Sequence, residues 1–188
     1  NIEITLNKDG DFIKDIYLKL KITSETSNSK GKWNYTRNFG FSLIKKVNLK
    51  IGNKLITTLY GSWLNIWYNL FNSNKKKKQI DKLIGNTTEA LTYDNNIKTI
   101  ELNIPIPFFY DIFILPIHNI IHNDISLIFE FNDSNKLINK SEYYYDNTKS
   151  TTTNNPDIIN QKYDINLIIS NSELISNHIY IDPTEYCF

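Results

Sequence analysis

Hydrophobic and polar residues alternate along most of this chain, which is the pattern of half-buried β-strands. At the start, Ile2, Ile4 and Leu6 alternate with polar neighbours. The same alternation predicts strands over residues 12–22, 41–51, 55–60, 98–107, 112–117, 125–131, 163–170 and 174–181. The strands are not separated by regularly spaced helices, so a parallel α/β sheet is not indicated. The pattern predicts an all-β fold, an antiparallel jelly-roll sandwich of about eight strands.

Residues 62–71 differ from the rest because their apolar positions have helical spacing. Ser62 is a suitable N-cap for a short helix. The apolar residues recur at i, i+3, i+4, i+7 and i+8 and form one stripe: Trp63, Ile66, Trp67, Leu70 and Phe71. Such a stripe either lines a binding groove or packs inward. We predict that it packs inward and closes an end or flank of the barrel.

Two turns and a long polar segment separate the predicted strands. Gly10 follows an aspartate in a turn signal, and Gly52 and Asn53 predict a tight hairpin because both accept a positive φ. Residues 132–161 are polar and of low complexity, which predicts a long exposed loop. We expect three consecutive aromatic residues to lie in this surface loop, as its anchor or as a sugar-binding surface: Tyr143, Tyr144 and Tyr145.

The composition favours a core built on large rings. Aromatic residues make up 13% of the 188 residues, and hydrophobic residues make up 40%, which is enough for one domain. Besides the helical stripe, the predicted core contains Phe108, Phe109, Phe129 and Phe131. The single cysteine, Cys187, excludes an internal disulfide and lacks the sequence context of a nucleophile.

Charge is balanced, since 21 basic and 20 acidic residues give a net charge of +1. No overall field therefore directs the chain to nucleic acid or to an anionic membrane. The four lysines at 75–78 lack interleaved aromatics and predict a solvated loop rather than a DNA contact. The apolar stretch 102–121 has about the length of a membrane span but is broken by three prolines, so we expect no membrane insertion.

No catalytic or metal site is indicated. His118 and His122 are four residues apart, but Asn119 stands where the helical zinc motif requires glutamate. The segment also has the pattern of a strand and a turn, in which residues four apart do not share a helical face. We therefore expect a protein without enzymatic activity, metal or cofactor.

Several segments resemble one protein family in order and spacing. Residues 7–20 contain Gly-Asp-Phe-Ile and then Tyr-Leu, residues 43–53 read LIKKVNLKIGN, and residues 60–67 read YGSWLNIW. Residues 102–110 read LNIPIPFFY and are followed by a Leu-Pro pair and by DISLIFEF at 124–131. These segments are similar to motifs in the major capsid proteins of nucleocytoplasmic large DNA viruses. The family has a second glycine where this chain has Asn53, which also tolerates left-handed conformations.

The resemblance implies the N-terminal barrel of a double jelly-roll capsid protein. Residues 1–182 are then one jelly-roll domain, and residues 183–188 begin a linker to a second jelly roll. The absence of methionine is consistent with a piece of a longer polypeptide. The resemblance further implies homotrimers that form pseudo-hexagonal capsomers in an icosahedral shell, minor capsid proteins as partners, a location in the virion, and assembly in the host cytoplasm. Two alternatives remain open: a carbohydrate-binding jelly-roll module, and a minor capsid or scaffold paralogue of the same family.

Overall fold

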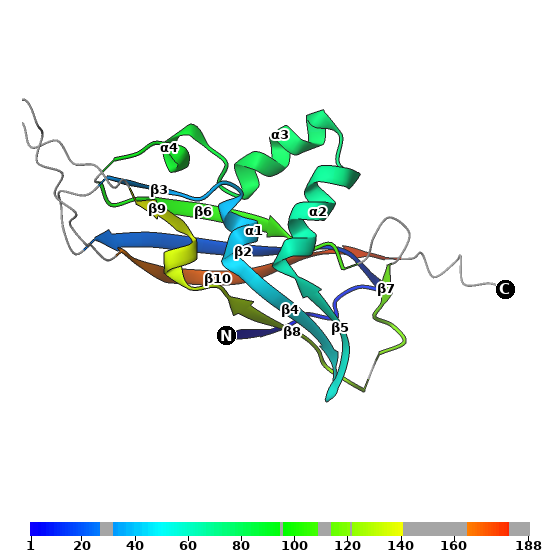
Figure 1. Ribbon diagram of the computed structural model, residues 1–188. Coiled ribbons are helices and arrows are strands. Elements are labelled where there is room, and N and C mark those ends of the chain that lie inside the picture. Colours follow the sequence, from blue (N-terminus) through cyan, green and yellow to red (C-terminus); the bar gives the residue numbers. More distant parts are fainter. Residues whose placement is uncertain (27–31, 95, 109–113, 121, 141–164, 181–188) are drawn as a thin grey trace, which may run out of the picture.

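The computed structural model describes the chain except residues 27–31, 95, 109–113, 121, 141–164 and 181–188, and its described part consists mainly of antiparallel strands (Figure 1). The strands are β1 (Ile2–Thr5), β2 (Phe12–Thr26), β3 (Trp33–Tyr35), β4 (Ile44–Ile51), β5 (Lys54–Tyr60), β6 (Thr99–Pro105), β7 (Leu115–Pro116), β8 (Ile125–Phe131), β9 (Ile138–Lys140) and β10 (Ile165–Ile179). The helices are α1 (Phe39–Leu43), α2 (Gly61–Phe71), α3 (Asn74–Leu83), α4 (Thr88–Leu91) and the 3-10 helix η1 (Ser134–Lys136).

The strands form two main sheets and a small ribbon. One sheet has the order β1-β8-β4-β5, and the other has the order β10-β2-β6 with the short β7 also paired to β2. The ribbon is formed by β3 and β9. Every pairing between these strands is antiparallel. The predicted all-β antiparallel fold is therefore confirmed.

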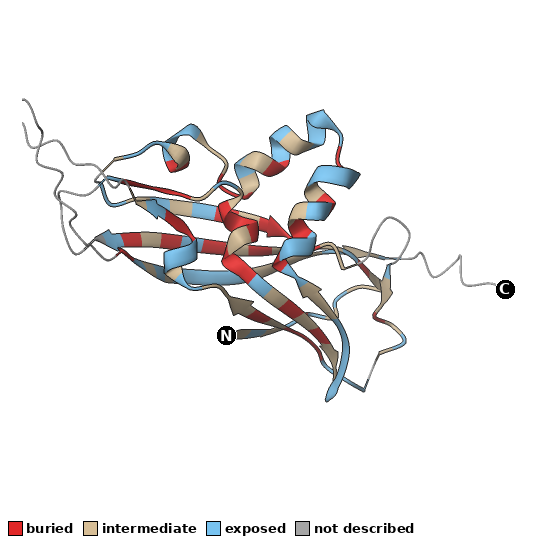
Figure 2. Ribbon diagram, viewed as in Figure 1, coloured by how far each residue is buried: buried red, intermediate tan, exposed pale blue. Residues whose placement is uncertain are grey.

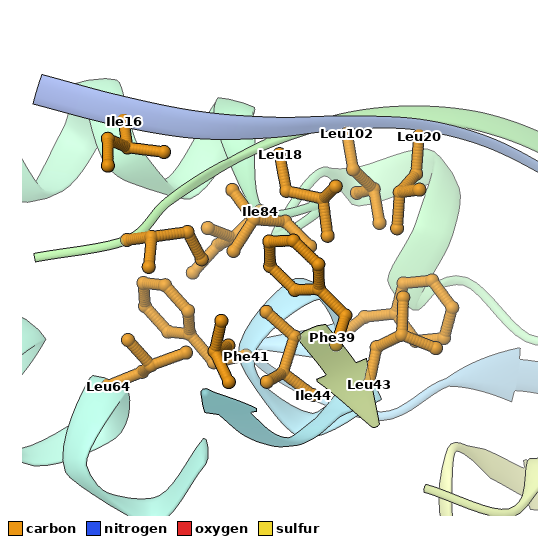
Figure 3. Packing of buried hydrophobic residues seen from close by; sticks show 14 of the residues in the cluster. Ile16, Leu18, Leu20, Phe39, Phe41, Leu43, Ile44, Leu64, Ile84 and Leu102 are labelled. Atoms are coloured by element: carbon orange, nitrogen blue, oxygen red, sulfur yellow. The ribbon is translucent and has the colours of Figure 1, made fainter. Parts of the chain in front are cut away.

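The core lies between the two main sheets. In β2, Ile16, Leu18 and Leu20 are buried and alternate with more accessible residues, because successive side chains of a strand point to opposite faces. Figure 3 shows these residues facing buried side chains from α1, from the start of β4 and from α2. Each fully buried aliphatic side chain contributes about 1.5–3 kcal/mol, so this layer holds the sheets together.

The longest pairing joins β2 to β10, from Thr26↔Ile165 to Phe12↔Ile179, with two register shifts. The prediction of two strands over residues 163–181 is wrong in this respect, because β10 continues through polar residues 170–173 as one strand. On the other side of β2, β6 is an edge strand in which Pro105 pairs with Tyr17. This position agrees with the expectation that a strand containing proline lies at a sheet edge.

The prediction of a single short helix is wrong. The predicted basic loop forms α3, in which the Ser73 side chain accepts a hydrogen bond from the backbone N–H of Lys76. Lysine and glutamine are good helix formers, but only Ile80 of α3 is buried, so the hydrophobic pattern gave no signal of this helix. No helix of the described chain is both long and apolar enough to cross a membrane.

Two further predicted segments differ in detail. The strand predicted from residue 41 begins at Ile44, because residues 39–43 form α1 after Asn38 adopts a left-handed conformation with φ of 55°. The predicted loop over residues 132–161 contains η1 and β9 in its described part, and β9 pairs with β3. The remainder of that predicted loop lies outside the described residues.

Candidate assembly surface

Helix α2 is fixed to the barrel by a direct backbone contact. It begins at Gly61, with Tyr60 as an N-cap that makes no side-chain capping bond, so the prediction of Ser62 as the N-cap is wrong. A Cβ atom on Gly61 would lie 1.9 Å from the carbonyl oxygen of Ile44 and 3.1 Å from that of Phe41. Only glycine permits this approach, and the contact sets the rotation of the helix against β4.

The buried face of α2 is not the face that the sequence predicted. Its buried residues are Gly61, Leu64 and Trp67, which are spaced three apart along one side. Figure 3 shows Leu64 beside Phe41 in the core. Leu64 was not among the predicted core residues. The signal that identifies this face is Gly61, whose small size marks the point of closest approach.

Most of the predicted stripe is exposed. Trp67 is only 9% exposed, but Trp63, Ile66, Leu70 and Phe71 are 39%, 45%, 71% and 42% exposed. For these four residues the prediction of an inward-facing core position is wrong. The physical reason is the rotation imposed by Gly61, which directs Leu64 inward and places the row of Trp63, Ile66 and Leu70 on the outside.

The third side of α2 is covered by α3. The Lys76 Nζ atom lies 6.0 Å from the centroid of the Trp67 ring, and the Lys77 Nζ atom lies 5.6 Å from that of Tyr68. The Lys77 ammonium also donates a hydrogen bond of 2.9 Å to the carbonyl oxygen of Asn69. Cation–π contacts of this kind are worth about 0.5–1 kcal/mol at exposed sites, and they keep two of the four consecutive lysines on the helix pair.

A polar network joins α2 and α3 to the start of α1. The Tyr68 hydroxyl donates to the Asp81 carboxylate at 2.7 Å, and the Asn86 amide donates to the same carboxylate at 2.8 Å. The Asn86 side-chain oxygen accepts the backbone N–H of Asn38 at 2.6 Å, and the Asn38 side-chain amide donates to Asn65 in α2 at 2.9 Å. Burial, together with the hydrogen bond to Asp81, raises the pKa of Tyr68 to about 12.

Strand β5, which leads into α2, is also poorly covered. It is an edge strand, and each of its seven residues is exposed or half-buried (Figure 2). Its exposed apolar residues are Leu55, Ile56 and Tyr60. Opposite β4, the pairing passes from Leu49↔Thr57 to Lys50↔Leu55, so Ile56 is an extra residue in a bulge. A bulge weakens the capacity of an edge to pair with another strand, so contact through side chains is favoured here over strand addition.

The predicted core phenylalanines lie in or beside the core where they are described. Phe129 is fully buried, and Phe108 and Phe131 are partly buried against the same cluster. The rings of Phe129 and Phe131 are 6.5 Å apart and stacked, since residues two apart in a strand share a face. Several predicted positions lie outside the described residues: Phe109, Tyr143, Tyr144, Tyr145 and Cys187.

The predicted turn residues act in two different ways. Gly52 lies in the β4–β5 hairpin with φ of 55°, whereas Asn53 is not among the residues with positive φ. Gly10 does not have a positive φ, and a Cβ at this position would lie 2.8 Å from the Cβ of His178. Its small size therefore lets the chain before β2 lie against the end of β10.

The two histidines that are four residues apart, His118 and His122, have separate environments. The His118 Nδ1 atom is 3.1 Å from the carbonyl oxygen of Asp11, and its ring meets that of Phe12 edge-on at 5.1 Å. His122 is exposed in the following turn. Within the described ranges, no three histidine, cysteine or acidic side chains are grouped so that they could hold a metal ion.

Comparison with known proteins finds relatives that are all described as capsid proteins. Residues 1–182 match the family described as the major capsid protein N-terminus. Probable capsid protein 4 of Acanthamoeba polyphaga mimivirus is 34% identical over 117 residues, which cover 58% of this chain and 22% of that protein. The major capsid protein of Pyramimonas orientalis virus is 28% identical over 142 residues, which cover 72% of this chain and 35% of that protein.

Solved structures show the same fold. The Faustovirus major capsid protein superposes with a TM-score of 0.69 at 10% identity, covering 98% of this chain and 52% of that chain. The quasi-atomic model of the PBCV-1 virus capsid gives a TM-score of 0.59 at 17% identity, covering 97% of this chain and 38% of that chain. At such low identities the likeness concerns the fold alone.

Two antiparallel sheets arranged as in these neighbours define a protein of the jelly-roll fold. Since the family match extends over residues 1–182, the chain belongs to the major capsid protein family of large DNA viruses and matches its N-terminal region. The matched segment spans 22% and 35% of the two relatives described above.

Proposed function

We propose that this chain is one jelly roll of a capsid protein that builds the icosahedral shell of a large DNA virus. The observation that carries the proposal is the family match over residues 1–182, which includes every described strand from β1 to β10. In this proposal residues 1–182 are one domain, and residues 183–188 begin a linker to a second jelly roll. The function is mechanical: hydrogen-bonded sheets form a stiff wall, and the outer surfaces form contacts with neighbours.

The proposal includes a trimeric, pseudo-hexagonal capsomer. Its support is the capsid identity of the relatives and the PBCV-1 capsid neighbour. Assembly in the host cytoplasm and contacts with minor capsid proteins belong to the same proposal. Cross-linking of purified virions followed by mass spectrometry tests these contacts: cross-links from this chain to itself and to minor capsid proteins are expected, and their absence from intact shells contradicts them.

The decisive experiment uses the complete polypeptide that carries this sequence. Its mass in solution is measured by mass photometry, and its outline is examined by negative-stain electron microscopy. We expect particles of three times the polypeptide mass with a hexagonal outline. A folded polypeptide that stays monomeric and does not enter shells overturns the proposal. A Gly61→Val variant is the control, because it disrupts the contact between α2 and β4 and should abolish assembly.

A further inference from the structure

A polar cavity lies beside the ribbon of β3 and β9, where the ribbon meets α3 and α4 (Figure 1). Its volume is about 350 Å³, at the lower end of the ~300–1,000 Å³ that small-molecule sites occupy. Most of the side chains that line it carry an amide or a charge: Asn34, Arg37, Asp81, Asn86 and Asn139. A cavity with this lining is suited to a small ligand that is held by hydrogen bonds.

The donor of this cavity is Arg37, the single arginine among the 21 basic residues of the chain. It is exposed, and in the described part of the chain its side chain has no hydrogen-bond or ion-pair partner. The five N–H groups of its guanidinium are therefore available to a ligand. The backbone on both sides is fixed, because the N–H of Thr36 donates to the carbonyl oxygen of Leu137 at 3.0 Å and the N–H of Asn38 donates to Asn86 Oδ1 at 2.6 Å.

The same cavity also offers acceptors that are already held in place. The Asp81 Oδ1 atom accepts hydrogen bonds from the Tyr68 hydroxyl and the Asn86 amide, whereas Asp81 Oδ2 accepts none from the described residues. The Asn139 amide nitrogen donates to Asn34 Oδ1 at 3.1 Å, and the Asn139 side-chain oxygen likewise has no donor among the described residues. Because one end of each side chain is bonded, the other end is a preorganised acceptor, which lowers the entropic cost of binding.

We propose that this cavity binds carbohydrate, a neutral ligand whose hydroxyl groups both donate and accept hydrogen bonds. The Arg37 guanidinium donates to hydroxyl oxygens, and the Asp81 and Asn139 oxygens accept hydrogen bonds from hydroxyl groups. The competing ligand is a phosphate or a carboxylate, because arginine by itself favours such anions. The Asp81 carboxylate opposes an anion, since like charges repel and since a fully ionised anion has no hydrogen to donate to that carboxylate.

The test uses the complete polypeptide that carries this sequence. Its sugar probes are free D-glucose, D-galactose, D-mannose, L-fucose, L-rhamnose, D-xylose and N-acetyl-D-glucosamine, and their binding is measured by saturation-transfer difference NMR. Inorganic phosphate is the anionic probe, and its binding is measured by isothermal titration calorimetry.

Two variants change the lining of the cavity. Arg37→Ala removes the donor, and it should fold because the side chain is exposed and has no partner among the described residues. Asp81→Asn removes the negative charge but keeps an oxygen that can accept the hydrogen bonds of Tyr68 and Asn86. Lys82→Ala is the matched control, because Lys82 is an exposed basic residue of α3 outside the cavity. Circular dichroism checks folding, and Arg37→Ala decides with the same probes if Asp81→Asn does not fold.

We expect at least one sugar to bind the wild-type protein and the control alike. Arg37→Ala should bind it about tenfold more weakly or less, as for the loss of a hydrogen bond to a charged group. Asp81→Asn should also weaken sugar binding, whereas it would strengthen phosphate binding by removing a like charge.

Sugar binding that either folded variant leaves unchanged overturns the inference, and so does the absence of binding by every sugar. Binding of phosphate alone, lost in Arg37→Ala, also overturns it and assigns the cavity to an anion. Each of these results leaves the proposed function intact, because the assembly of a shell does not require an occupied cavity and is measured separately by particle mass and outline.

Discussion

The α-carbon of Gly61 lies directly against the carbonyl oxygen of Ile44, so closely that a Cβ atom would stand 1.9 Å from that oxygen. This contact joins the first residue of α2 to the first residue of β4. It decides which side of the helix enters the core and therefore which apolar residues remain outside.

Substitution of Gly61 by alanine should destabilise the protein strongly. The added methyl group meets backbone rather than a movable side chain, so the start of α2 has to shift away from β4. We expect a loss of at least about 3 kcal/mol in the free energy of unfolding, at the upper end of the overpacking range, measured by urea denaturation. Ser62→Ala is the control, because Ser62 is exposed, and it should change stability by less than about 0.5 kcal/mol. A stable Gly61→Ala variant would show that the helix is free to move.

Two leucines of the same helix provide a direct test of its orientation. Leu64 is fully buried and Leu70 is 71% exposed. Leu64→Ala should lower the free energy of unfolding by about 2–5 kcal/mol, since it removes buried methyl groups and leaves a cavity. Leu70→Ala should cost less than about 0.5 kcal/mol in the monomeric chain. Similar losses for the two variants would contradict the rotation described here.

Alkaline pH should weaken the fold through two tyrosines. Burial raises the pKa of Tyr35 to about 12, and burial with the hydrogen bond to Asp81 raises that of Tyr68 to about 12. The folded-state pKa of both tyrosines lies above the unfolded-state pKa of about 10. Their contribution to the free energy of unfolding is therefore complete below about pH 10 and is lost as the pH rises through about 12.

Ultraviolet absorbance should show these two of the twelve tyrosines ionising late. The urea midpoint of the wild-type protein should fall over the same pH range. In the Tyr35→Phe/Tyr68→Phe variant the midpoint should fall less steeply. An equally steep fall in the variant would assign the alkaline loss to other groups.

Acid should remove a surface interaction between neighbouring strands. Glu130 in β8 accepts a hydrogen bond from Lys45 and forms an ion pair with Lys46 at 3.0 Å, and these lysines lower the pKa of Glu130. Because the folded-state pKa of this carboxyl is lowered, its ionised form stabilises the fold at pH values above the unfolded-state pKa of about 4.3. This stabilisation is lost as the pH falls through the folded-state pKa.

The difference in stability between the wild-type protein and Glu130→Gln should therefore be constant at neutral pH and disappear below about pH 4. It should also shrink in high salt, because the three side chains are at least partly exposed and salt screens their interaction. A difference that is independent of both pH and salt would mean that the effect of the substitution is not electrostatic.

The sequence predicted the strands well where alternation was strong, as in β2 and β8. It also located α2, because its apolar residues have helical spacing. It did not predict which side of that helix faces the core, since an apolar stripe alone does not show how the helix is rotated against the sheets. The deciding residue was Gly61, which makes no apolar contribution to the pattern.

Elements stabilised by polar contacts were the least predictable. Helix α3 buries little, and its position depends on Tyr68, Asp81 and Asn86, which are separated along the sequence and meet only in the fold. Ribbon β3–β9 likewise pairs Trp33 with Lys140, so no local pattern could indicate it. The exposure of most of the apolar stripe of α2 likewise follows from the fold and not from the local sequence pattern.

The position of β2 between β6 and β10 also governs the order of events during synthesis. Its residue Phe12 pairs with Ile179, so the sheet is completed only after synthesis has passed residue 179. At roughly 5–20 residues per second, translation leaves one edge of β2 without its partner strand for about ten seconds or more. Pairings so distant in sequence also make for slow folding. The edge of β2 that receives β10 is therefore the last edge of this strand to be paired during synthesis.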